Sequence, residues 1–93
     1  METIPLWNAI AEMRRLTEAG ETFSFVHASY ERDKQITQGI RVVHKAKLRS
    51  AAPEEKVKNA DHKLFYYDIV IREPRVCWQP LIMYFNGKKV IPG

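Results

Sequence analysis

The side chains able to perform metal or acid–base chemistry are few and lie far apart in the sequence. The chain has three histidines, His27, His44 and His62, and a single cysteine, Cys77. Zinc sites are built from several His, Cys or carboxylate ligands in one cluster. His27 and His44 can meet only if their two strands pair, and no third ligand accompanies them. The sequence therefore predicts no metal site and no cofactor.

Nucleophilic catalysis needs a Ser or Cys beside a base that a third group orients. Ser24, Ser29 and Ser50 lack the context of a nucleophile elbow, and no base stands near Cys77. A free Cys of this kind is usually buried and inert, and a single Cys excludes an intramolecular disulfide. We therefore expect Cys77 to be a packing residue.

Paired carboxylates for acid–base work would have to come from Asp61 with Asp68, or from Glu54 with Glu55. Asp68 stands in the middle of a predicted strand, where a salt bridge to a nearby Lys or Arg is its ordinary role. The four glycines are isolated, so no glycine-rich loop can cradle a phosphate. The sequence predicts no catalytic residue and a protein that is not an enzyme.

A row of cations on one strand is the feature that most resembles a binding site. Within residues 39–50, four basic side chains alternate on one face, interrupted only by Val43: Arg41, Lys45, Lys47 and Arg49. Neighbours two residues apart on a strand lie roughly 7 Å apart, so such a row can follow a phosphate backbone. Possible stacking platforms for bases are Tyr30, Tyr66, Tyr67 and Trp78. The structural alternative is an ordinary solvated face, whose lysines discourage aggregation of sheets.

The elements that position these residues begin with a helix predicted over residues 4–19. Its apolar residues recur at helical spacing, and Trp7 widens the apolar stripe. Thr3 is expected to cap the helix, Pro5 suits its first turn, and Gly20 suits a left-handed stop.

Five strands follow, with period-2 alternation, over residues 22–30, 39–50, 63–72, 75–85 and 88–91. Glu73-Pro74 is predicted to turn the chain, and Pro80 to restrict its strand to an edge or a bulge. Asn86-Gly87 predicts a type I′ hairpin in which Phe85 pairs with Lys88, because both central residues need positive φ.

Size and charge limit the function classes. The chain has 93 residues, a formal net charge of +4 and a pI near 9.4. This length predicts a single domain over residues 1–93, too small for separate cofactor and substrate domains. A high pI is a first indication of nucleic-acid binding.

The sequence shows no signal peptide and no membrane span, so we expect a cytoplasmic protein, or a virion-associated one if it derives from a phage.

The runs IPLWNAIAEMRRLTEAGETFSF, KLR, NADHKL and CWQPLIMYFNGKKV resemble small uncharacterised proteins of phages and prophage-like elements of gut bacteria. The resemblance implies a virion component or an accessory protein of a mobile element, with no functional motif attached. The layout of one helix before five antiparallel strands is similar to Sm-like RNA-binding proteins and other small SH3-like barrels, although the Sm sequence signatures are absent.

These observations predict an α+β fold in which an N-terminal helix packs on a curved antiparallel sheet of about five strands. The sheet is expected to form an SH3-like, partly open small barrel. Several strands are apolar on both faces, and one helix cannot cover all of that surface. We therefore expect a structural or assembly protein that contacts itself or a neighbouring virion protein through Trp78, Leu81, Ile82 and Tyr84. The alternatives are a nucleic-acid-binding protein that uses the face of residues 39–50, and an inhibitor or regulator of a host enzyme.

Overall fold

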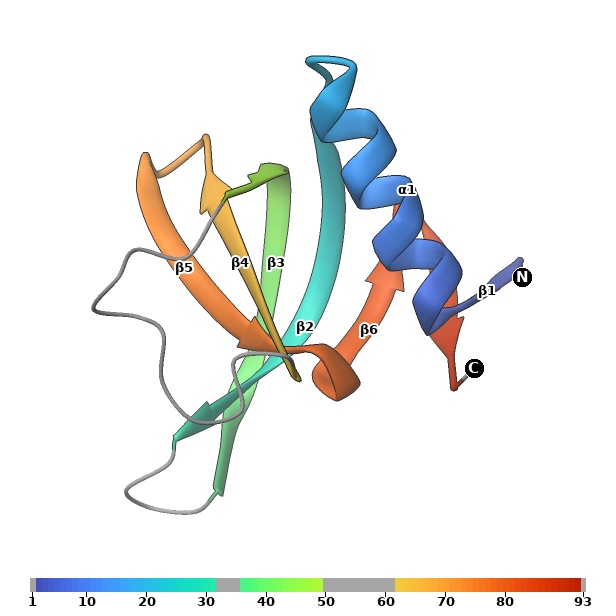
Figure 1. Ribbon diagram of the computed structural model, residues 1–93. Coiled ribbons are helices and arrows are strands. Elements are labelled where there is room, and N and C mark those ends of the chain that lie inside the picture. The colour runs from blue at the N-terminus through green and yellow to red at the C-terminus, as the bar shows by residue number, and fades with distance from the viewer. Residues whose placement is uncertain (1, 32–35, 50–61, 93) are drawn as a thin grey trace.

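The computed structural model describes residues 2–31, 36–49 and 62–92, with no side-chain description for 29–31 and 36–38. In these ranges, one α-helix precedes most of a seven-stranded sheet of order β1-β7-β6-β2-β3-β4-β5 (Figure 1). All neighbouring strands are antiparallel except β1 and β7. The elements are β1 (Thr3–Pro5), α1 (Leu6–Glu18), β2 (Phe23–Glu31), β3 (Ile36–Leu48), β4 (Lys63–Asp68), β5 (Glu73–Trp78), the 3-10 helix η3 (Gln79–Leu81), β6 (Ile82–Phe85) and β7 (Lys88–Ile91).

The helix α1 is shorter than predicted, and the prediction of its cap was wrong. Pro5 occupies the N-cap position without a side-chain hydrogen bond, and Thr3 pairs with Lys89 in the parallel ladder between β1 and β7. Gly20 ends the helical segment at a φ of +77°, as expected for a left-handed stop. Trp7 is 61% exposed and does not widen the buried stripe. No helix in the described residues is long and apolar enough to cross a membrane.

The core lies between α1 and one face of the sheet, which we call the inner face; the opposite face is the outer face. Alternate residues of β2 and β4 point inward and are buried. The buried apolar residues are Ile4, Ala9, Ile10, Met13, Phe23, Phe25, Val43, Ala46, Leu64, Tyr66, Cys77, Ile82 and Phe85. The helix is also tied to the sheet by Thr17, whose Oγ1 donates to the Met13 carbonyl and accepts from the Leu48 amide.

The described sheet has seven strands where about five were predicted, and it is an open sheet where a partly open barrel was predicted. Among the described strands, β1 and β5 form the two edges of the ladder. The strand predicted over residues 75–85 is two strands, because η3 with Pro80 interrupts it. β5 pairs with β4, whereas β6 pairs with β2, so the chain changes position in the sheet at η3. Figure 1 shows β4 and β5 on one side of the long, bent strand β2, and β6 on the other.

The turn between β4 and β5 also differs from the prediction. β4 ends at Asp68, and residues 69–72 form the turn, in which Arg72 has a φ of +57°. Glu73 and Pro74 were predicted to turn the chain but instead begin β5. Pro74 is tolerated there because an edge strand leaves backbone positions unpaired.

A β-bulge in β3 reverses which residues face the core. Phe25 pairs with Val43 but Phe23 pairs with Ala46, so β3 has one more residue than β2 over this interval. Val43 and Ala46 are consequently both buried, although strict alternation would place them on opposite faces. Before the bulge, Ile40 and Val42 point outward and are 64% and 55% exposed. The alternation of residues 39–50 predicts that Ile40 and Val42 share the apolar face with Ala46 and Leu48, and this prediction is wrong.

The hairpin between β6 and β7 agrees with the sequence. Phe85 pairs with Lys88, and Asn86 and Gly87 have φ values of +46° and +83°. The Asn86 Oδ1 atom also accepts a 2.8 Å hydrogen bond from the Ser24 amide, which ties the turn to the start of β2.

Candidate nucleic-acid interface

A surface rich in cations and aromatic rings covers the outer face of β3, β4 and β5. In β4 the inward positions are Leu64, Tyr66 and Asp68, which are all buried, so the intervening residues point outward. Cross-strand partners share a face, which adds the outward residues of the neighbouring strands. We call this surface the basic–aromatic face: Lys45, Lys47, Arg49, Lys63, Phe65, Tyr67, Pro74, Val76 and Trp78.

Three cation–ring pairs organise the basic–aromatic face. The Lys47 Nζ lies 6.0 Å from the ring centroid of Tyr67, its partner across the ladder. The Arg49 guanidinium carbon lies 5.6 Å from the Phe65 ring centroid. The Lys63 Nζ lies 5.1 Å from the Trp78 ring centroid, again between cross-strand partners. Distances of this size give a favourable interaction between a cation and the negative face of the ring.

The charge of this face has one sign. None of the described outward side chains of β3, β4 and β5 is acidic, because Asp68 and Glu73 are cross-strand partners on the inner side. Lys45 and Lys47 are exposed, whereas Lys63 and the three rings are half-buried. The face therefore combines mobile ammonium groups with rings that are held in place.

Arg49 is held by the backbone. Its Nε donates to the Tyr66 carbonyl at 3.0 Å, and its Nη2 donates to the Arg75 carbonyl at 3.2 Å. These bonds join the end of β3 to β4 and β5, so Arg49 positions the strands that carry the rings.

The predicted row of four cations is not continuous. Arg41 pairs with His27 before the bulge and lies on the inner face, half-buried. Lys45, Lys47 and Arg49 follow the bulge and lie on the outer face. Lys63 and Phe65, which the sequence interpretation did not include, complete the surface. Alternation puts Lys63, Phe65 and Tyr67 on one face of the strand, but both faces of residues 63–68 carry aromatic side chains, so nothing local indicates which face points outward.

Two of the predicted stacking platforms are on this surface, and one is not. Tyr67 and Trp78 lie on the basic–aromatic face, but Tyr66 is fully buried. The side chain of Tyr30 lies outside the described side chains.

The Tyr66 hydroxyl bonds to His27 Nε2 at 2.9 Å, while His27 Nδ1 donates to the Ala28 carbonyl at 3.0 Å. Because a carbonyl only accepts, this arrangement suits a neutral His27 whose Nε2 accepts a hydrogen bond from the Tyr66 hydroxyl.

Burial determines the protonation of this inner pair. Desolvation lowers the pKa of His27, and the positive charges of nearby Arg41 and Arg75 lower it further. Desolvation also raises the pKa of Tyr66 above its ordinary range. His27 is 3% exposed and already has partners for both nitrogens, so its geometry is that of a satisfied core residue.

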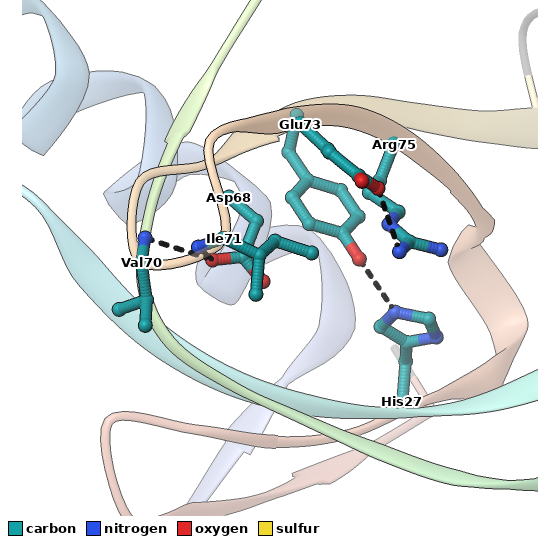
Figure 2. A network of polar contacts seen from close by, with 7 residues as sticks. His27, Asp68, Val70, Ile71, Glu73 and Arg75 are labelled. Atoms are coloured by element: carbon teal, nitrogen blue, oxygen red, sulfur yellow. Dashed lines mark hydrogen bonds and ion pairs between the residues drawn. The ribbon is translucent and has the colours of Figure 1, made fainter.

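The acidic residues near this pair have structural partners, as Figure 2 shows. Asp68 Oδ1 accepts hydrogen bonds from the Val70 and Ile71 amides at 3.1 and 3.3 Å, and thereby closes the turn between β4 and β5. The expected role of Asp68, an ion pair with a cation, is thus replaced by binding to backbone amides. Glu73 forms a 2.9 Å ion pair with Arg75.

The candidate nucleophiles have no catalytic surroundings in the described part of the chain. Burial raises the pKa of the Cys77 thiol to about 12, so the thiol stays protonated at neutral pH. Ser24 Oγ contacts Asn86 Oδ1 and no base.

The described residues contain no group of three or more metal-ligating side chains. Ser50, Glu54, Glu55 and Asp61 lie outside the described residues, while His44 and His62 are exposed.

The four residues predicted as a protein interface do not form one surface. Trp78 lies on the outer face of β5 and Tyr84 on the outer face of β6, with three strands between them in the sheet. Ile82 is buried in the core, and Leu81 is half-buried in η3. Ile82 also contributes to an apolar groove of about 160 Å³, lined by Leu6, Pro80, Ile82, Val90, Ile91 and Pro92.

A second outer surface is apolar. Register places Val26 beside both Val42 and Tyr84, and Ala28 beside Ile40. We call this surface the apolar strip: Val26, Ala28, Ile40, Val42 and Tyr84. It lies on β2, β3 and β6. The apolar strip and the basic–aromatic face meet on β3, where Val42 belongs to the strip and Lys45 to the basic–aromatic face.

No family model, curated protein or solved structure matches this chain. The resemblance to small phage proteins therefore remains a prediction.

Proposed function

We propose that this protein is a non-enzymatic nucleic-acid-binding module that uses the basic–aromatic face. The observation that carries the proposal is the set of three cation–ring pairs on one face with no acidic side chain among its described residues. Cations neutralise phosphates, and rings offer surfaces on which bases stack, so the two kinds of group together suit a nucleic acid.

The number of available cations predicts the salt dependence of binding. Arg41 faces inward and Arg49 is engaged with backbone carbonyls, which leaves Lys45, Lys47 and Lys63 as phosphate contacts. Three neutralised phosphates give a slope of log K against log salt of about −2 to −3. The four cations predicted from the sequence, which include Arg41 and Arg49, would give a steeper slope of log K against log salt.

The test compares two double variants with the same change in net charge. Lys45→Glu with Lys47→Glu reverses two of the four cations of the basic–aromatic face, and Lys88→Glu with Lys89→Glu reverses two lysines of β7. We expect the first pair to weaken binding of a mixed-sequence oligonucleotide at least 30-fold and the second pair to weaken it less than 3-fold. The measurement is fluorescence anisotropy on nuclease-treated protein at several salt concentrations.

Equal losses in the two double variants would contradict the proposal, because binding would then follow net charge rather than this face. Absence of binding by the unaltered protein at low salt would contradict it as well.

Self-assembly is a second candidate function, and the apolar strip favours it. Ile40 and Val42 are each more than half exposed on a continuous apolar surface. A second copy could cover this strip face to face. Light scattering should then report a dimer that persists in high salt, and Val42→Lys should convert it to a monomer. A monomer at high micromolar concentration would rule this candidate out.

A further inference from the structure

We infer that the basic–aromatic face binds single-stranded nucleic acid, with bases stacked on Tyr67 and Trp78. This inference rests on the proposed function, because it names the form of the nucleic acid that the face would bind. Three observations support it: the order of the rings, the placement of the lysines over them, and the separate role of Arg49.

The three rings follow one another across β4 and β5, with Phe65 between Tyr67 and Trp78. Tyr67 and Phe65 are two residues apart on β4, which separates them by roughly 7 Å. Phe65 pairs with Val76, and Trp78 is the next outward residue of β5. Trp78 is therefore a diagonal neighbour of Phe65, roughly 7–8 Å away. An unpaired strand can place one base on Tyr67 and another on Trp78, with Phe65 and the Arg49 guanidinium between them, whereas the bases of a duplex are already stacked on one another.

The shape of the surface also disfavours a duplex. The major groove accepts an inserted helix or a two-stranded ribbon. The basic–aromatic face is the outer side of three neighbouring strands, and its rings are half-buried among them. Half-buried rings of this kind can stack on an unpaired base, whereas direct readout in a groove needs groups that enter it.

The lysines are placed to bind phosphate when a base occupies the ring. The ammonium of Lys63 lies 5.1 Å from the centre of Trp78, and that of Lys47 lies 6.0 Å from the centre of Tyr67. A base that stacks on either ring displaces the flexible ammonium, which then lies close to the phosphate of the same nucleotide. Each of these two pairs thus forms a subsite for one nucleotide.

The pair of Arg49 and Phe65 has a different role. Arg49 donates to two backbone carbonyls, so it is a positioning residue and its guanidinium is not available to leave the ring freely. Substitution of Arg49 would disturb the strands themselves. The test therefore uses Trp78, Tyr67 and Lys63.

The experiment uses the two tryptophans of the chain, Trp7 and Trp78. Trp7→Phe removes the exposed tryptophan of α1 and leaves Trp78 as the only reporter on the sheet. This variant is titrated with a 12-mer of oligothymidylate, a duplex of the same length, and a 12-mer of abasic phosphodiester. We expect quenching of Trp78 by the oligothymidylate only, with an affinity at least 10-fold above that for the other two probes.

Alanine variants then assign the rings. Trp78→Ala and Tyr67→Ala should each weaken oligothymidylate binding roughly 5- to 150-fold, the range expected for loss of one stacked base. Tyr84→Ala, which removes a tyrosine from the outer face of β6, should change the affinity less than 2-fold. Lys63→Gln should weaken binding of both oligothymidylate and the abasic probe. Circular dichroism confirms that each variant is folded before its affinity is compared.

The outcomes separate this inference from the proposed function. Equal affinity for the oligothymidylate and the abasic probe, without quenching of Trp78, would overturn the inference and leave a phosphate-binding face. Preference for the duplex would overturn it in the same way. No binding of any of the three probes at low salt would overturn the proposed function itself.

Discussion

The side chains of His27 and Tyr66 depend on each other, because each satisfies a buried polar atom of the other. His27 Nε2 and the Tyr66 hydroxyl are 2.9 Å apart, and both residues are almost completely buried. Tyr66→Phe leaves the His27 nitrogen without its donor, and an unpaired buried group costs ~1–3 kcal/mol. We expect the free energy of unfolding in urea to fall by that amount.

The matched control is Tyr67→Phe, one residue along the same strand. Its hydroxyl lies on the outer side of the sheet, so this substitution should change stability by less than about 0.5 kcal/mol. A similar small change in Tyr66→Phe would show that the buried hydrogen bond contributes little.

The same histidine predicts a dependence of stability on pH. Burial lowers the pKa of His27 in the folded protein, whereas an unfolded His titrates near about 6.5. Below that pH the unfolded chain binds the proton first, so acid favours unfolding. Above it both states are neutral, and the contribution is constant. We expect stability to fall as pH decreases from about 6.5, with a slope of up to about 1.4 kcal/mol per pH unit.

Urea unfolding between pH 7.5 and 5.5 measures this slope. His27→Gln should reduce it, and substitution of the exposed His44 by Gln should leave it unchanged. The same slope in all three proteins would assign the effect to groups other than His27.

At the scale of the elements, the hairpin of β6 and β7 depends mainly on the conformation of its own turn residues. Gly87 has a φ of +83°, in the left-handed region that strains residues with a Cβ atom. Gly87→Val should lower stability by ~1–2 kcal/mol, which corresponds to a drop in the melting temperature of roughly 4–16 °C. Gly87→Asn should retain most of the stability, because Asn tolerates this conformation. Thermal unfolding of the two variants decides whether the turn conformation limits stability.

Local signals explain which elements the sequence could predict. Asn86-Gly87 and Gly20 require positive φ whatever surrounds them, and the structure has that conformation at each of these positions. Helix α1 was also predictable, because its apolar stripe is internal to one segment. In each of these cases the determining residues lie within a few positions of one another.

The features that sequence reasoning missed depend on distant partners. The bulge in β3 exists because Phe23 and Phe25 of β2 pair with Ala46 and Val43, and nothing within residues 39–50 specifies that register. This single extra residue moved Arg41 to the inner face and separated it from Lys45. β1 is similarly defined by its pairing with β7, more than eighty residues away in the sequence, and its three residues contain no strand signal of their own.

At the scale of the whole molecule, the sheet joins the two ends of the chain. β1 lies parallel to β7, so the described N- and C-terminal segments are adjacent in Figure 1. Helix α1 follows β1 directly and covers the inner face, which leaves the outer face to carry both the basic–aromatic face and the apolar strip. The two proposed activities therefore occupy neighbouring parts of one surface.

The edges of the sheet are protected against pairing with another copy. β1 has three residues and ends in Pro5, while β5 contains Pro74, which has no backbone donor. Short strands and edge prolines are features that prevent sheets from joining. Any self-association should therefore use the apolar strip and leave the strand edges free.

Replacement of Pro74 tests this protection. Pro74→Val restores a backbone donor on the edge strand and adds a residue that favours β structure, so we expect higher oligomers at high micromolar concentration, measured by light scattering. Pro74→Lys restores the same donor but adds a charge that opposes edge pairing, and it should remain monodisperse. If Pro74→Val behaves like the unaltered protein, the proline does not protect this edge, and the twist of β5 or a neighbouring segment must do so.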